Sequence, residues 1–76
     1  MEEKILDLIY EICDDKIIYK KRDVNMFETG LLESMDFIEL LMNIEEEFDI
    51  EIQPDEIKKD EMATPDMLIS FIKARL

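Results

Sequence analysis

The feature that most constrains the fold is a strong helical periodicity in the middle of the chain. Between Ser34 and Phe48, large apolar residues recur at intervals of four, three and four positions: Phe37, Leu41, Ile44 and Phe48. Residues at this spacing share one face of an α-helix, whereas a half-buried strand would show strict alternation. We expect the helix to begin with Ser34 as its N-cap, because a serine hydroxyl can accept a hydrogen bond from a free backbone N–H.

Three further segments also have helical signals. The first, residues 2–13, places apolar residues at helical spacing: Ile5, Leu8, Ile9 and Ile12. Pro54 suits the first position of a short third helix that contains residues 55–58, and Thr64 and Pro65 are N-cap and first-turn signals for a last helix. The pattern predicts an all-α fold, a four-helix up-and-down bundle of three longer helices and the short third helix.

The stretch from Lys16 to Glu33 lacks a clear period, and we expect a long ordered loop that crosses one end of the bundle. A loop of this length needs anchors, and its apolar residues are candidates: Ile17, Ile18, Val24, Phe27, Leu31 and Leu32. The chain has 76 residues, which is too few for two cores. Residues 1–76 should therefore form a single domain.

Charge is concentrated in the centre of the chain. From Asp23 to Ile57 there are 12 acidic residues and no Lys or Arg, and the remainder is balanced, so the whole net charge of −12 resides in this segment. Such a surface is a poor partner for nucleic acid or anionic membrane, and it attracts basic patches on other proteins.

The chain has one cysteine and no histidine. A lone Cys13 cannot form a disulfide within the chain, which fits the reducing cytoplasm, and without a basic neighbour it should be buried and inert. We expect no membrane insertion, because no apolar stretch approaches the length of a bilayer span. The lack of histidine removes the commonest acid–base group and disfavours an enzyme, and no spacing suggests a metal site.

The segment Phe27–Asp36 carries the most specific signal. Gly30 can permit a tight turn, Leu31 and Leu32 can dock the end of the loop, and Ser34 then emerges at the start of a helix. Taken alone, a serine at this place is ordinarily just a cap. However, the N-terminus of a helix also favours an attached anion.

Gly30-Leu31-Leu32-Glu33-Ser34-Met35-Asp36 resembles the phosphopantetheine attachment motif of acyl and peptidyl carrier proteins, with Glu-Ser-Met in place of the usual Asp-Ser-Leu. The resemblance extends through residues 39–48, which are similar to the second helix of that family. It implies that a separate transferase moves 4′-phosphopantetheine from coenzyme A onto Ser34. The terminal thiol of this arm then holds the cargo as a thioester, and the chain itself is not an enzyme.

A narrower resemblance is to the D-alanyl carrier proteins of teichoic acid modification. It rests on residues 11–18, on Val24–Leu32 and above all on the Ala-Thr-Pro within Asp60–Asp66. The chain departs from that subfamily at Met62, where tryptophan is usual, and at Ile57-Lys58-Lys59, which replaces a Phe-Asp-Arg pattern. This resemblance implies D-alanine as the cargo.

The partners implied are a phosphopantetheinyl transferase, an adenylating ligase and an acceptor acyltransferase, and we expect the chain to be a monomer. Candidates for partner recognition surround Ser34 or follow it on the same helix: Glu33, Met35, Asp36, Glu39, Met42 and Glu46. Two alternatives stay open. One is an acyl or aminoacyl/peptidyl carrier for fatty acid, polyketide or nonribosomal peptide synthesis, and the other is an unmodified acidic helical adaptor.

Overall fold

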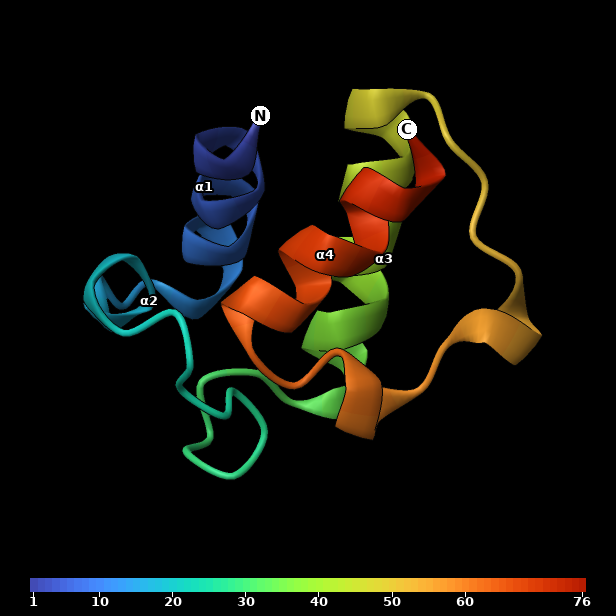
Figure 1. The fold of residues 1–76 in the computed structure, drawn as a ribbon. Helices are drawn as coiled ribbons and strands as arrows, with labels where there is room; N and C mark the ends of the chain where they lie inside the picture. The colour runs from blue at the N-terminus through green and yellow to red at the C-terminus, as the bar shows by residue number, and fades with distance from the viewer.

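The computed structural model describes residues 1–76, with the side chain of Pro54 outside the description. Its elements are α1 (Glu2–Cys13), α2 (Ile17–Lys20), α3 (Ser34–Phe48), the 3₁₀ turns η1 (Pro54–Glu56) and η2 (Lys59–Glu61), and α4 (Pro65–Arg75). Helix α1 packs against α2, α3 and α4. Figure 1 shows the connection from α3 to α4 running around the outside of the molecule, and η2 lying near the start of α3. The prediction of a small all-α bundle is confirmed.

The core lies where the apolar faces of the three longer helices meet. The side chains with 0% exposure on these helices come in pairs: Ile5 and Ile9 from α1, Leu40 and Ile44 from α3, and Leu68 and Ile72 from α4. Each pair is separated by four residues, so both members lie on the same side of the helix. Full burial of such a side chain contributes roughly 1.5–3 kcal/mol, which makes these positions the main source of stability.

The ends of the helices show how local sequence sets their limits. Helices α1 and α3 both end at an aspartate in the left-handed region, Asp14 and Asp49, each with φ of 54°. Helix α4 begins as predicted, because Oγ1 of Thr64 accepts a hydrogen bond from the N–H of Met67 at 3.1 Å and Pro65 occupies the first turn. Within the described chain, no helix has the length and apolar character needed to cross a bilayer.

The prediction of an unbroken loop from Lys16 to Glu33 is wrong in one part, because this stretch contains the single turn α2. The carboxylate of Asp15 accepts a hydrogen bond from the N–H of Ile17 at 2.9 Å, and Ile18 is fully buried. Tyr19 also donates to the Asp7 carboxylate at 2.6 Å, which ties α2 to α1. The remaining loop anchors are confirmed, since all of them lie in or against the core.

The short third helix expected at residues 55–58 is also wrong in detail. Two separate 3₁₀ turns, η1 and η2, take its place. Lys58 has extended backbone angles, with φ of −128° and ψ of 110°, so no helix can continue through it. Ile57 is partly buried and packs against the core at this break.

Candidate modification site

Ser34 is exposed at the first turn of α3, at the end of the loop that enters this helix. The loop reverses at Gly30, whose φ of 78° lies in the left-handed region that glycine adopts without strain. It is then anchored by Leu32, which is 2% exposed and whose N–H donates to the carbonyl of Met26 at 2.9 Å. A buried anchor two residues before Ser34 therefore holds the hydroxyl outside the core.

The expectation that Ser34 is the N-cap of α3 is wrong. The N-cap is Glu33, and Ser34 is the first helical residue. The N–H of Glu33 donates to Oδ2 of Asp36 at 3.1 Å, which is one half of a capping box. An acidic residue three positions after Glu33 makes this arrangement available, and it leaves the Ser34 hydroxyl free of any capping role.

Lys59 is a residue of the site that sequence reasoning did not identify. Its ammonium donates a hydrogen bond to Oγ of Ser34, although 25 positions separate the two residues. The same ammonium lies 5.7 Å from the centre of the Phe27 ring. The available signal was that Lys58 and Lys59 are the first basic residues after the long acidic segment, but nothing local indicated which of the two would reach Ser34.

The predicted recognition residues fall into two environments. Met35 and Met42 are 83% and 58% exposed, and Glu33, Glu39 and Glu46 are exposed as well. Asp36 differs, because it is only half-exposed and its carboxylate accepts the Glu33 N–H. Its structural role at the helix start is therefore established by its contact, whereas its part in recognition stays a prediction.

The structure adds Ile38 to the exposed residues of α3. Ile38 is 57% exposed and lies three positions after Met35 and four before Met42, so the three side chains share one side of the helix. We call Met35, Ile38 and Met42 the α3 strip. The spacing could have revealed Ile38, but an isoleucine in an amphipathic helix is more often part of the core.

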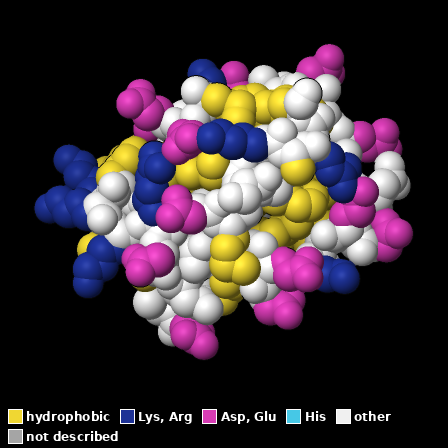
Figure 2. All heavy atoms as spheres, viewed as in Figure 1, with side chains coloured by type: hydrophobic (Ala, Val, Ile, Leu, Met, Phe, Trp, Pro, Cys, Tyr) yellow, Lys and Arg dark blue, Asp and Glu magenta, His cyan; other side chains and the backbone are white. Residues whose placement is uncertain are grey.

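Acidic side chains surround apolar ones over the molecular surface. Figure 2 shows magenta acidic groups spread over the whole visible face, with apolar patches between them, and a group of basic side chains at the edge formed by α2. The α2 region holds Lys16, Lys20 and Lys21, all of them exposed. The charge of the central segment is thus displayed on the outside of the fold.

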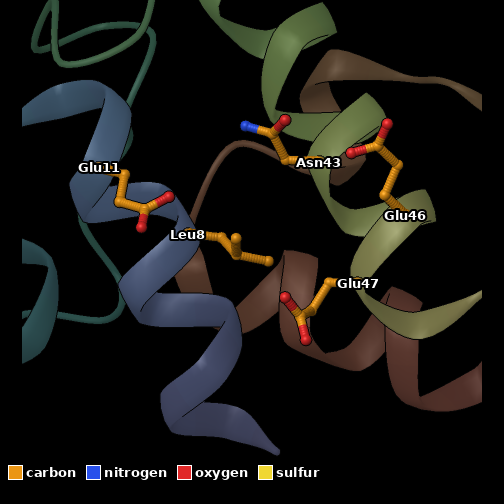
Figure 3. A pocket seen from close by; sticks show the side chains of 5 residues that line it. All are labelled: Leu8, Glu11, Asn43, Glu46 and Glu47. Carbon is orange, nitrogen blue, oxygen red and sulfur yellow. The ribbon is translucent and has the colours of Figure 1, made fainter.

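An open hollow of about 320 Å³ lies between α1 and α3. Figure 3 shows Leu8 and Glu11 from α1 facing Asn43, Glu46 and Glu47 from α3. Glu46 is twelve positions after Ser34, which corresponds to about 18 Å along a helix. The hollow is therefore distant from the Ser34 hydroxyl, and its carboxylates give it a polar lining.

Cys13 lies at the end of α1 and is half-buried rather than fully buried. Its Sγ donates to the carbonyl of Asp15 at 3.7 Å. Burial raises the pKa of the Cys13 thiol, which reduces the thiolate fraction that would react as a nucleophile. Among the side chains that the structure describes, no group of three or more His, Cys, Asp or Glu residues could hold a metal ion.

The family of the chain follows from sequence comparison. The family described as "Phosphopantetheine attachment site" matches residues 3–72. The chain belongs to this family of phosphopantetheine-dependent carrier proteins. As a family member it is a carrier whose cofactor is 4′-phosphopantetheine, and it is not an enzyme. This membership also removes the alternative of an unmodified adaptor.

Two named relatives narrow the comparison within the carrier family. The chain is 36% identical over 76 residues to the D-alanyl carrier protein of Abiotrophia defectiva. This alignment covers 100% of the chain and 96% of the relative. It is 38% identical over 72 residues to the D-alanyl carrier protein of Bacillus cereus strain B4264, with 95% and 91% covered. Both alignments span nearly the full length of both proteins.

The residues around Ser34 fit the cofactor of this carrier family. The hydroxyl is exposed, it is free of capping bonds, and it lies at the positive end of α3. A phosphodiester formed there would face the free N–H groups of the first helical turn. When bound, the arm supplies a terminal thiol for thioester chemistry, while the protein supplies the place of attachment and the surface that enzymes recognise.

Proposed function

We propose that the chain carries D-alanine as a thioester on a 4′-phosphopantetheine arm attached to Ser34, for the modification of teichoic acids. The observation that carries the proposal is the exposed, uncapped hydroxyl of Ser34 at the start of α3, within a chain whose relatives are named D-alanyl carrier proteins. The other serine, Ser70, is exposed on α4 and lies outside the attachment motif.

Attachment requires one bond exchange at Ser34. Its Oγ bonds to the phosphorus that joins the arm to the rest of coenzyme A, adenosine 3′,5′-bisphosphate leaves, and the hydroxyl proton passes to a base of the transferase. The helix dipole of α3 favours the negative charge of the resulting phosphodiester. The chain contains no histidine, so it has no imidazole base of its own to take this proton.

The partner surface of this proposal is the α3 strip together with the acidic residues beside it, Glu39 and Glu46. Exposed methionines can adapt to different partners, and carboxylates attract basic patches. Three enzymes would use the surface in turn: the transferase, an adenylating ligase and an acceptor acyltransferase. Because the transferase consumes coenzyme A and the ligase consumes ATP, we propose that the protein works in the cytoplasm. We also propose that it is a monomer.

A mass measurement tests the attachment site. Incubation with coenzyme A and a broad-specificity transferase should add one phosphopantetheinyl group to the wild-type chain. Ser34→Ala should abolish the addition, and Ser70→Ala, the matched control, should leave it unchanged. An unmodified wild-type chain, or a Ser34→Ala chain that is still modified, would refute the proposed site.

A loading assay then tests the cargo. The modified chain should be charged by a D-alanine adenylating ligase in the presence of ATP, and hydroxylamine should cleave the thioester to release D-alanine hydroxamate and the free thiol of the arm. L-Alanine and fatty acids with their own ligases are the comparison substrates. Loading by a fatty-acyl ligase together with failure of the D-alanine ligase would assign the chain to the acyl carriers instead.

A further inference from the structure

The aromatic ring that the Lys59 ammonium contacts beside Ser34 is itself fixed in place. Phe27 packs edge-on against the buried Phe37, with 5.1 Å between ring centres and an angle of 85°. The turn that contains Phe27 is fixed by Asn25, whose Oδ1 accepts the N–H groups of Phe27 and Glu28 at 3.0 and 2.9 Å. The ring therefore offers a fixed aromatic face to the Lys59 ammonium, and such faces attract cations.

The backbone on the other side of the contact is tied to the same loop. The N–H of Met26 donates to the carbonyl of Ala63 at 2.8 Å, close to the end of η2. Met62, the residue that follows η2, is 1% exposed. The segment that bears Lys59 and the loop that leads into α3 are thus joined, which holds the backbone of Lys59 near the start of α3.

The charges of the residues around Ser34 are mostly negative. Glu33 and Asp36 flank the serine, and Asp60 and Glu61 follow Lys59 in η2. A phosphodiester on Ser34 would add a further negative charge to this acidic surface. Lys59 is the cation that contacts the hydroxyl, and the phosphorus would be one bond away from the atom that it already contacts.

We propose that Lys59 is a positioning residue for the arm: its ammonium pairs with the phosphodiester on Ser34 and holds the first bonds of the arm on the η2 side of α3. This inference rests on the proposed function, because it requires Ser34 to be the attachment site. It goes beyond it by assigning a counter-ion within the carrier itself. A charge-assisted hydrogen bond from an ammonium to a phosphate oxygen is stronger than the bond to a neutral hydroxyl that it replaces.

The test compares neighbouring lysines. Lys59→Gln and Lys58→Gln remove the same charge from adjacent positions, but Lys58 lies on extended backbone and makes no ion pair or side-chain hydrogen bond within the described part of the chain. Each variant is converted fully to the modified form, which mass spectrometry verifies at Ser34. The readouts are the ³¹P resonance of the phosphodiester and the difference in melting temperature between modified and unmodified forms.

We expect Lys59→Gln to shift the ³¹P resonance toward that of the phosphodiester in unfolded modified chain, and high salt to shift the wild-type resonance in the same direction. Lys59→Gln should also lower, by about 4 °C, the melting temperature of the modified form relative to that of the unmodified form. Lys58→Gln should behave as wild type, and Lys59→Arg should restore both readouts.

Equal effects of Lys58→Gln and Lys59→Gln would show that only total charge matters and would overturn the proposal. Identical readouts for wild type and Lys59→Gln would overturn it as well. Both results differ from a failure of the proposed function, in which the wild-type chain receives no arm on Ser34 at all.

Discussion

At the residue scale, Phe37 and Ile38 show how adjacent apolar side chains take different roles. Phe37 is 1% exposed and contacts Phe27, whereas Ile38 is 57% exposed in the α3 strip. Both side chains are large and apolar, so their residue types do not distinguish their roles. Their positions on different faces of the helix do. One belongs to the core, and the other belongs to the surface that we assign to partners.

Phe37→Ala should destabilise the fold by about 3–5 kcal/mol, because it removes a buried aromatic ring and leaves a cavity. A core of this size supplies roughly 3–5 kcal/mol in total, so most of the variant should be unfolded at room temperature. Thermal unfolding followed by far-UV circular dichroism measures the loss.

Ile38→Ala is the matched control for Phe37→Ala and tests the α3 strip. It should change the free energy of unfolding by less than about 0.5 kcal/mol, since the side chain is largely in solvent already. It should nevertheless slow loading by the adenylating ligase. Destabilisation as large as that of Phe37→Ala would contradict the exposed position of Ile38.

At the element scale, the start of α4 depends on one side chain. Oγ1 of Thr64 accepts the N–H of Met67 at 3.1 Å and satisfies a donor that the helix leaves free. Thr64→Ala should therefore lower the free energy of unfolding by about 1 kcal/mol, and a chain of this size should lose roughly 4–8 °C in melting temperature. Calorimetry of the unmodified chain checks the value.

Thr64→Ser provides the control for this cap, because it keeps the hydroxyl and removes only a methyl group. It should retain most of the stability that Thr64→Ala loses. If both variants unfold at the same temperature, the hydroxyl of Thr64 does not stabilise α4.

The elements that could be predicted from sequence are those with local causes. In residues 2–13 and in the helix that ends at Phe48, apolar residues recur at helical spacing over several turns. Helix α4 has a capping residue and a proline at its start. The single turn α2 and the 3₁₀ turns could not be predicted, because so few residues cannot offset the cost of starting a helix without tertiary contacts. Buried Ile18 supplies such a contact for α2.

At the scale of the whole molecule, the net charge of −12 opposes folding. Folding brings the carboxylates closer together than they are in the unfolded chain, and they repel one another. Added NaCl should therefore raise the melting temperature by screening this repulsion, and Mg²⁺ should do so at lower concentration. Calorimetry across a salt series measures the trend. A melting temperature that falls with salt would mean that the surface ion pairs outweigh the repulsion.

Ion pairs join the distant parts of the fold. Glu2 at the start of α1 contacts Lys73 of α4 and Arg22 of the loop, and Glu56 contacts Arg75. The Lys73 ammonium and the Arg22 guanidinium lower the pKa of the Glu2 carboxyl, and the Arg75 guanidinium lowers the pKa of Glu56.

These pairs predict a loss of stability in acid. A carboxyl with a lowered folded-state pKa stabilises the fold fully above its ordinary value of 4.5, and this stabilisation disappears as the pH falls through the folded-state value. Urea unfolding between pH 7 and pH 3 measures the effect. Glu2→Gln should reduce the slope below pH 4.5, whereas Glu3→Gln, which alters a neighbouring exposed acid, should reduce it less.

The sequence alone determined the long helices, the uneven charge and the motif around Ser34, because each of these depends on residues close together in the chain. Tertiary structure decided which of two neighbouring lysines contacts Ser34, and that Ile18 is buried in the single turn α2. These outcomes depend on contacts between segments as far apart as Ser34 and Lys59, which are created only when the helices pack. The break in the expected third helix lies at Lys58, directly after Ile57, whose side chain packs partly buried against the core.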